Sequence, residues 1–135
     1  MPRAALLSLH ARIEEVQPDT WEDPSLVQLW GPRYSVYVVA AADRALFSLG
    51  RMPDSDKGRR RATEVTAQLH AVLDGRRLTD REVGNALGYN HNRLRYAATT
   101  GRVVIRWEGA RAPVVWTVTA PDVDPHDAQL ELARR

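Results

Sequence analysis

The hydrophobic pattern between residues 78 and 101 has a helical period that is interrupted once. Thr79 and Glu82 have the spacing of a capping box, in which the hydroxyl and the carboxylate each accept from a backbone N–H at the start of a helix. Gly88 can end that helix because glycine adopts the left-handed conformation without a steric penalty. The pattern predicts a helix between these residues, and its apolar positions are Val83, Ala86 and Leu87.

A second helix is predicted directly after the first. Asn90 is a good helix cap, and Gly101 marks the end. The apolar residues at helical spacing are Leu94, Ala97 and Ala98. The remaining face carries hydrogen-bond donors and one aromatic ring, from His91, Asn92, Arg93, Arg95, Tyr96, Thr99 and Thr100. We expect the Tyr96 ring to join the hydrophobic packing rather than to act as a stacking platform.

Two segments with alternating β-type residues follow the second helix. The alternation over residues 102–107 predicts a strand with Val103, Ile105 and Trp107 on one side and Arg102, Val104 and Arg106 on the other. A second strand is predicted over residues 114–119, and the loop between them carries Arg111 at its tip. Two helices joined by a tight turn and followed by a β-hairpin are typical of a winged helix-turn-helix, in which the hairpin is the wing.

The flanking segments complete an α+β prediction. Residues 62–75 are expected to form the first helix of the winged helix, whose three helices and β-hairpin wing span residues 62–120. Before it, residues 1–50 predict a small mixed α/β segment with an N-terminal helix, a strand at 35–40 and a short helix at 41–50, and residues 51–61 predict a linker. After it, residues 121–135 start another helix.

The charge is concentrated on the predicted winged helix. Residues 57–111 hold twelve Lys and Arg against five acids, a net charge of +7, while the flanking blocks are acidic and the whole chain carries +2. A basic patch on one module is the footprint of a protein that binds the phosphate backbone, so we expect double-stranded DNA as the partner. Candidate contacts to base edges are Asn90, Asn92, Arg93 and Arg95, and His91 beside them is a further candidate for DNA binding. Candidate contacts to phosphates are Arg76, Arg77, Arg81, Arg102, Arg106 and Arg111.

Other function classes find little support. The chain has no cysteine, which excludes disulfides and thiolate metal sites and makes an intracellular protein the default. No apolar run approaches the roughly 18 residues of a membrane span, so we expect a cytoplasmic, nucleoid-associated protein without a membrane contact. The four His are scattered, and the paired acids fit helix starts or opposite helix faces, so no metal, cofactor or catalytic residue is predicted. No coiled-coil heptad sets an oligomeric state.

The order of segments is similar to the bacterial winged-helix DNA-binding family that includes the AlkZ-type DNA glycosylases. The similar segments are LLSLHAR, LWGPRYSVYVV, AADRALFSLGRMP, the winged helix and ELARR. Family members are longer, and the glycosylases among them excise alkylated bases and unhook crosslinks in DNA repair. The resemblance therefore implies that this chain is an internal fragment of such a protein.

Two departures from the family pattern bear on activity. The family's catalytic Gln-x-Gln or Gln-x-Asp motif precedes the position of Pro2 and is absent here, and none of the four glutamines, Gln17, Gln28, Gln68 and Gln129, has such a partner. Where the family tends to have Arg-Gly-Thr-x-His, this chain keeps only Arg33. We therefore expect the chain to be inactive by itself.

Three hypotheses follow from the sequence. The first is a DNA-binding fragment of a repair-glycosylase-like protein. The second is a transcription regulator, which normally needs a dimer to contact two half-sites. The third is a scaffold whose winged helix binds a protein. The concentration of basic residues on one module favours DNA.

Overall fold

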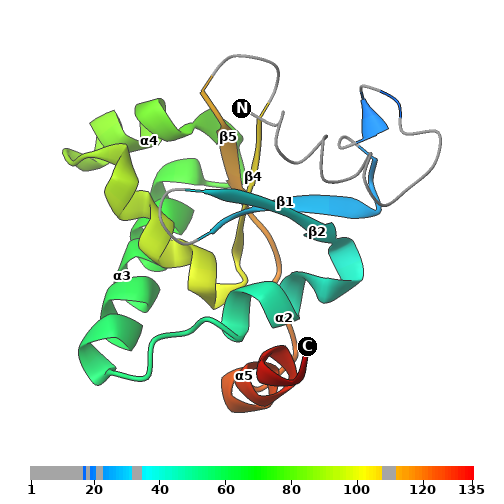
Figure 1. Cartoon of the computed structure of the whole chain (residues 1–135). Helices are drawn as coiled ribbons and strands as arrows, with labels where there is room; N and C mark the ends of the chain where they lie inside the picture. The colour runs from blue at the N-terminus through cyan, green and yellow to red at the C-terminus, as the bar shows by residue number, and fades with distance from the viewer. Residues whose placement is uncertain (1–16, 18, 21–22, 32–34, 108–111) are drawn as a thin grey trace.

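An antiparallel sheet of five strands runs through the computed structural model, which describes residues 17, 19–20, 23–31, 35–107 and 112–135 (Figure 1). The strand order is β2-β1-β4-β5-β3. The strands are β1 (Leu26–Trp30), β2 (Val36–Ala40), β3 (Leu78–Thr79), β4 (Val103–Arg106) and β5 (Val114–Thr117). The expected N-terminal helix and the loop tip with Arg111 lie outside the described residues.

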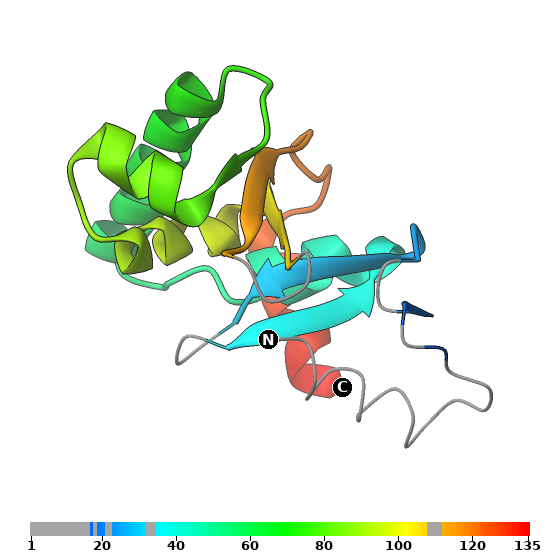
Figure 2. The ribbon, with the colours of Figure 1, turned by 90° about the horizontal axis from the view of Figure 1, so that it is seen from above.

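The helices form two groups beside this sheet, which confirms the α+β class. Figure 2 shows α3, α4 and η4 together near β4 and β5, while the β1–β2 hairpin extends away from them. The α-helices are α2 (Arg44–Leu49), α3 (Asp56–Leu73), α4 (Asp80–Leu87) and α5 (Pro125–Arg134). The 3-10 helices are η3 (Ala41–Asp43) and η4 (His91–Thr100). Because α5 packs mainly on α2, these two helices form the second group.

Helix α3 begins earlier than its hydrophobic pattern suggests. The Ser55 hydroxyl accepts from the Gly58 backbone N–H at 3.2 Å, and Asp56 in the first turn suits the positive end of the helix dipole. The helix therefore starts at Asp56, and residues 56–61, which we expected to belong to a linker, are its first turns. Their charges face solvent rather than marking irregular structure.

Helix α4 confirms the predicted capping box. The Thr79 hydroxyl accepts from the Glu82 backbone N–H at 3.2 Å, and the Glu82 carboxylate accepts from the Thr79 backbone N–H at 2.7 Å. Gly88 ends the helix with φ 69°, as expected of a left-handed cap. Val83 is fully buried, but Ala86 is exposed, so the predicted apolar stripe is narrower than its spacing suggested.

Replacing Thr79 by alanine should destabilise the protein by about 1 kcal/mol at neutral pH, as for other lost helix caps. Hydrogen bonds from Thr79 lower the pKa of Glu82. The stabilisation from the ionised carboxylate is therefore full above the ordinary pKa that Glu82 has in the unfolded chain, and it is lost as the pH falls through the lower folded-state pKa. Urea denaturation at neutral pH and below pH 4 should show the difference between the two proteins narrowing in acid.

The second predicted helix has the expected ends and a different period. Asn90 caps η4 and Gly101 ends it with φ 68°, but all ten residues are 3-10 rather than α-helical. The Arg93 backbone N–H donates to the Asn90 carbonyl at 2.9 Å, three residues back. A 3-10 helix has three residues per turn, so side chains three positions apart lie in one row. This period changes which side chains face outward.

Strand β4 is central to the sheet and is buried on both faces. Val103 and Ile105 on one side are buried, and Val104, which the alternation places on the other side with two arginines, is also only 2% exposed. Successive side chains of a strand point to opposite faces of the sheet, so the burial of all three valine and isoleucine side chains means that both faces of β4 are covered. The buried Gln28 of β1 accepts from the Trp107 backbone N–H at 3.0 Å and extends the contact between β1 and β4. One sheet therefore joins the β1–β2 hairpin to the strands that follow α3.

A hydrophobic core cluster lies between α3, α4, η4 and one face of the sheet. Its buried members are Trp30, Val65, Leu69, Leu73, Val83, Leu94, Ala97, Ala98, Val103, Ile105 and Val115. This cluster fixes η4 against α3 and β4, which positions the outer residues of η4.

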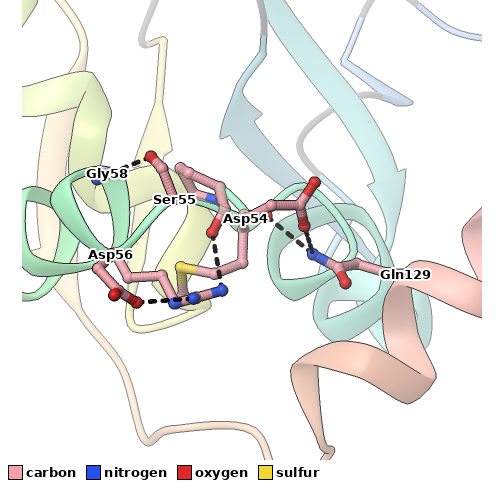
Figure 3. Close-up of polar contacts among 8 residues, drawn as sticks. Asp54, Ser55, Asp56, Gly58 and Gln129 are labelled. Carbon is pink, nitrogen blue, oxygen red and sulfur yellow. Dashed lines mark hydrogen bonds and ion pairs between the residues drawn. The ribbon is translucent and has the colours of Figure 1, made fainter.

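Helix α5 is attached to the segment that precedes α3. Asp124 caps α5 with Pro125 at its first position, as predicted. The Gln129 amide donates to the Met52 carbonyl at 2.9 Å and to the Asp54 carboxylate at 3.3 Å (Figure 3). Because Ser55 caps α3 just beyond this contact, α5 supports the start of α3.

Candidate nucleic-acid interface

The outer row of η4 presents a cation and an aromatic ring. Arg93 and Tyr96 are three residues apart and lie in one row of the 3-10 helix, and both are exposed. The Tyr96 side chain is 45% exposed, so our expectation that it packs in the core is wrong. The period explains the difference, because Leu94 and Ala97 form the buried row instead.

A residue of α3 completes this surface. The Arg61 guanidinium lies over the Tyr96 ring, 4.8 Å from its centroid, which is a cation–π distance. Arg61, Asn92, Arg93 and Tyr96 line an open depression of about 340 Å³, and we call these four residues the η4 face. Two guanidinium groups, an amide and a phenol ring in one depression suit an anionic partner with planar groups.

Tyr89, in the turn before η4, supports the Arg93 side chain. The Arg93 guanidinium lies 4.7 Å from the centroid of the Tyr89 ring. The Tyr89 hydroxyl donates to the Gln68 side-chain oxygen of α3 at 3.0 Å. Burial raises the pKa of Tyr89, and the positive charge of Arg93 acts in the opposite direction. The phenol therefore stays protonated near neutral pH and keeps this hydrogen bond, which holds the ring under Arg93.

The other predicted base-contacting residues differ in their accessibility. The Asn90 side-chain oxygen accepts from the Asn92 backbone N–H at 2.9 Å and is used in capping η4. The His91 side chain lies outside the described residues. Arg95 is half-buried, with Nε and Nη1 shielded from solvent, so its side chain is less accessible than we expected of a base contact. The 3-10 period accounts for this, because Arg95 shares a row with the buried Ala98.

The predicted phosphate contacts are spread over several elements. Arg76 donates to the Leu73 and Val72 carbonyls at the end of α3, and Arg77 lies 4.4 Å from the centroid of the Trp116 ring. Both residues belong to the turn between α3 and β3, and neither lines the depression of the η4 face. The exposed Arg81 lies on α4 and the exposed Arg102 precedes β4, while Arg106 is half-buried; Arg111 lies outside the described residues.

The described residues offer no metal site and no membrane span. Among them, no three His, Asp or Glu side chains gather where they could hold a metal ion. None of the described helices combines the length and apolar character required to cross a membrane. No protein-family model, curated protein or solved structure matches this chain. The chemistry of the η4 face is therefore the basis for assigning a function.

Proposed function

We propose that residues 56–117 form a winged helix that binds double-stranded DNA through the η4 face. The order of elements α3, β3, α4, η4, β4 and β5 supports this proposal, together with the antiparallel pairing of β5 with both β3 and β4. In a winged helix with this order, the helix before the hairpin enters the major groove. Here that helix is η4.

The η4 face carries the proposal. The outward pair of Arg93 and Tyr96, with Arg61 beside it, places two cations within one depression. Arg93 and Asn92 have the side chains that form two-point contacts with guanine and adenine. Arg61 lies on α3 rather than at the start of η4, and its guanidinium is suited to contact a phosphate of the DNA backbone. A role in the repair of alkylated or crosslinked DNA is a narrower form of this proposal, and its support is the order of sequence segments.

The experiment that tests DNA binding is fluorescence anisotropy with a labelled duplex between about 50 and 200 mM salt. We expect affinity to fall steeply with salt, and Arg93→Ala to weaken binding about 10-fold, which is near the lower part of the range for a lost base-contacting arginine. Arg134→Ala is the matched control, because it removes the same charge from an exposed position of α5. Its affinity should match that of the unmodified chain.

Two results would contradict the proposal. One is the absence of binding at low salt by a chain whose circular dichroism is that of the folded protein. The other is an equal loss of affinity in Arg93→Ala and Arg134→Ala, which would mean that net charge alone controls binding.

A further inference from the structure

A second concave site lies on the other flank of α3. This cavity of about 360 Å³ is bounded by Thr63, Thr66 and His70 of α3 on one side and by Thr100 and Arg102 on the other. Pockets for small organic molecules begin at about 300 Å³. The cavity shares no lining residue with the η4 face, so it is a separate candidate site.

The hydroxyl pair of Thr66 and Thr100 in this cavity is already occupied. The two oxygens are 3.1 Å apart, Thr66 lies 2.8 Å from the Ala62 carbonyl, and Thr100 lies 2.8 Å from the Ala97 carbonyl. The two hydroxyl groups have only two protons for these three hydrogen-bond contacts. Neither hydroxyl therefore has a proton left to donate to a ligand. A charged group of a ligand must therefore bind elsewhere in the cavity.

Arg102 provides that place. Its side chain is exposed, and its guanidinium makes no hydrogen bond, ion pair or ring contact with any residue in the described part of the chain. A guanidinium binds a carboxylate through two parallel hydrogen bonds. The exposed His70 imidazole contributes a second nitrogen-bearing group to the same lining.

Met52 indicates which kind of nonpolar group of a ligand would fit in the cavity. Met52 belongs to the lining, and the Thr99 hydroxyl lies 3.7 Å from its sulfur. A methionine sulfur makes favourable contacts with aromatic rings. We propose that this cavity binds a small aryl carboxylate, with the carboxylate on Arg102 and the ring between α3 and Met52.

The test is an NMR titration of the full chain with 2-naphthoate, followed through backbone amide shifts. We expect saturable shifts at Thr66, Thr100 and Arg102, and a dissociation constant at least about 10-fold higher in Arg102→Gln, because the two-point contact is lost. Ala67→Leu, which narrows the cavity without changing charge, should also weaken binding. Arg134→Gln, at an exposed position of α5 outside the cavity lining, is the matched control and should bind 2-naphthoate as the unmodified chain does.

A comparison of 2-naphthoate with the neutral amide of the same shape tests whether the negative charge of the carboxylate contributes to binding. 2-Naphthamide should bind clearly more weakly than 2-naphthoate. Equal affinity for the two compounds would overturn the carboxylate assignment. The absence of shifts at these three amides with millimolar 2-naphthoate would overturn the site itself, and so would unchanged affinity in both Arg102→Gln and Ala67→Leu.

Discussion

Replacing Leu94 by alanine should destabilise the protein by about 3 to 4 kcal/mol, the middle of the range for a buried leucine truncated in a packed core. Leu94 is fully buried in the cluster that joins η4 to α3 and the sheet. The loss combines the hydrophobic transfer free energy of the removed atoms with the cost of the cavity that remains, because neighbours such as Val65 and Leu69 can relax only in part. Urea denaturation followed by circular dichroism measures the change in the free energy of unfolding.

Leu130 offers a matched control for this experiment. It lies on α5 and is 45% exposed, so Leu130→Ala removes the same atoms from a surface position. Its effect should stay within about 0.5 kcal/mol, as for most surface substitutions. A Leu94→Ala protein that loses no more stability than Leu130→Ala would show that η4 does not pack on α3 as described.

The ends of the helices could be predicted because their signals are local. Thr79 and Glu82 are three residues apart, and the capping box that they form needs no other part of the chain. Asn90 and Gly101 mark the ends of η4 in the same way. Such signals depend on backbone groups within one turn, so the sequence contains all the information that they require.

The period of η4 could not be predicted from these signals. Apolar residues at Leu94, Ala97 and Ala98 are compatible with both the α-helical and the 3-10 period. The difference decides the candidate site, because the 3-10 period turns Arg95 inward and leaves Tyr96 exposed. When the apolar residues of a short segment fit both helical periods, the sequence predicts the ends of the helix correctly. It predicts only part of the set of outward-facing side chains correctly.

Contacts between segments that are distant in the chain also could not be predicted from the sequence. The hydrogen bond from the Trp107 backbone to Gln28 joins residues 79 positions apart, and it depends on β1 pairing with β4. Arg61 was missed for the same reason, since its position over the Tyr96 ring requires α3 to lie beside η4. The run of three arginines at 59–61 shows positive charge, but only the packing selects Arg61.

Reversing both charges of the η4 face, in Arg61→Glu/Arg93→Glu, should weaken duplex binding by at least about 100-fold near 100 mM salt. Each substitution removes a favourable contact and adds repulsion from the phosphates. Both side chains are exposed, so the fold should persist by circular dichroism. Arg134→Glu/Arg135→Glu is the matched control, because it makes the same change in net charge on exposed residues at the end of α5. Equal losses of affinity in the two double variants would contradict the proposed interface.

The single alanine variants separate the roles of the two arginines. If Arg61 contacts a phosphate, Arg61→Ala lowers the slope of log affinity against log salt by about one and weakens all duplex sequences equally. If Arg93 contacts a base, Arg93→Ala weakens the preferred sequence most and reduces the difference between sequences. The geometry favours this division, because Arg93 lies in the outer row of η4, whereas Arg61 extends from α3. The reverse result would place α3, rather than η4, nearest the bases, and would require a different docking of this module on DNA.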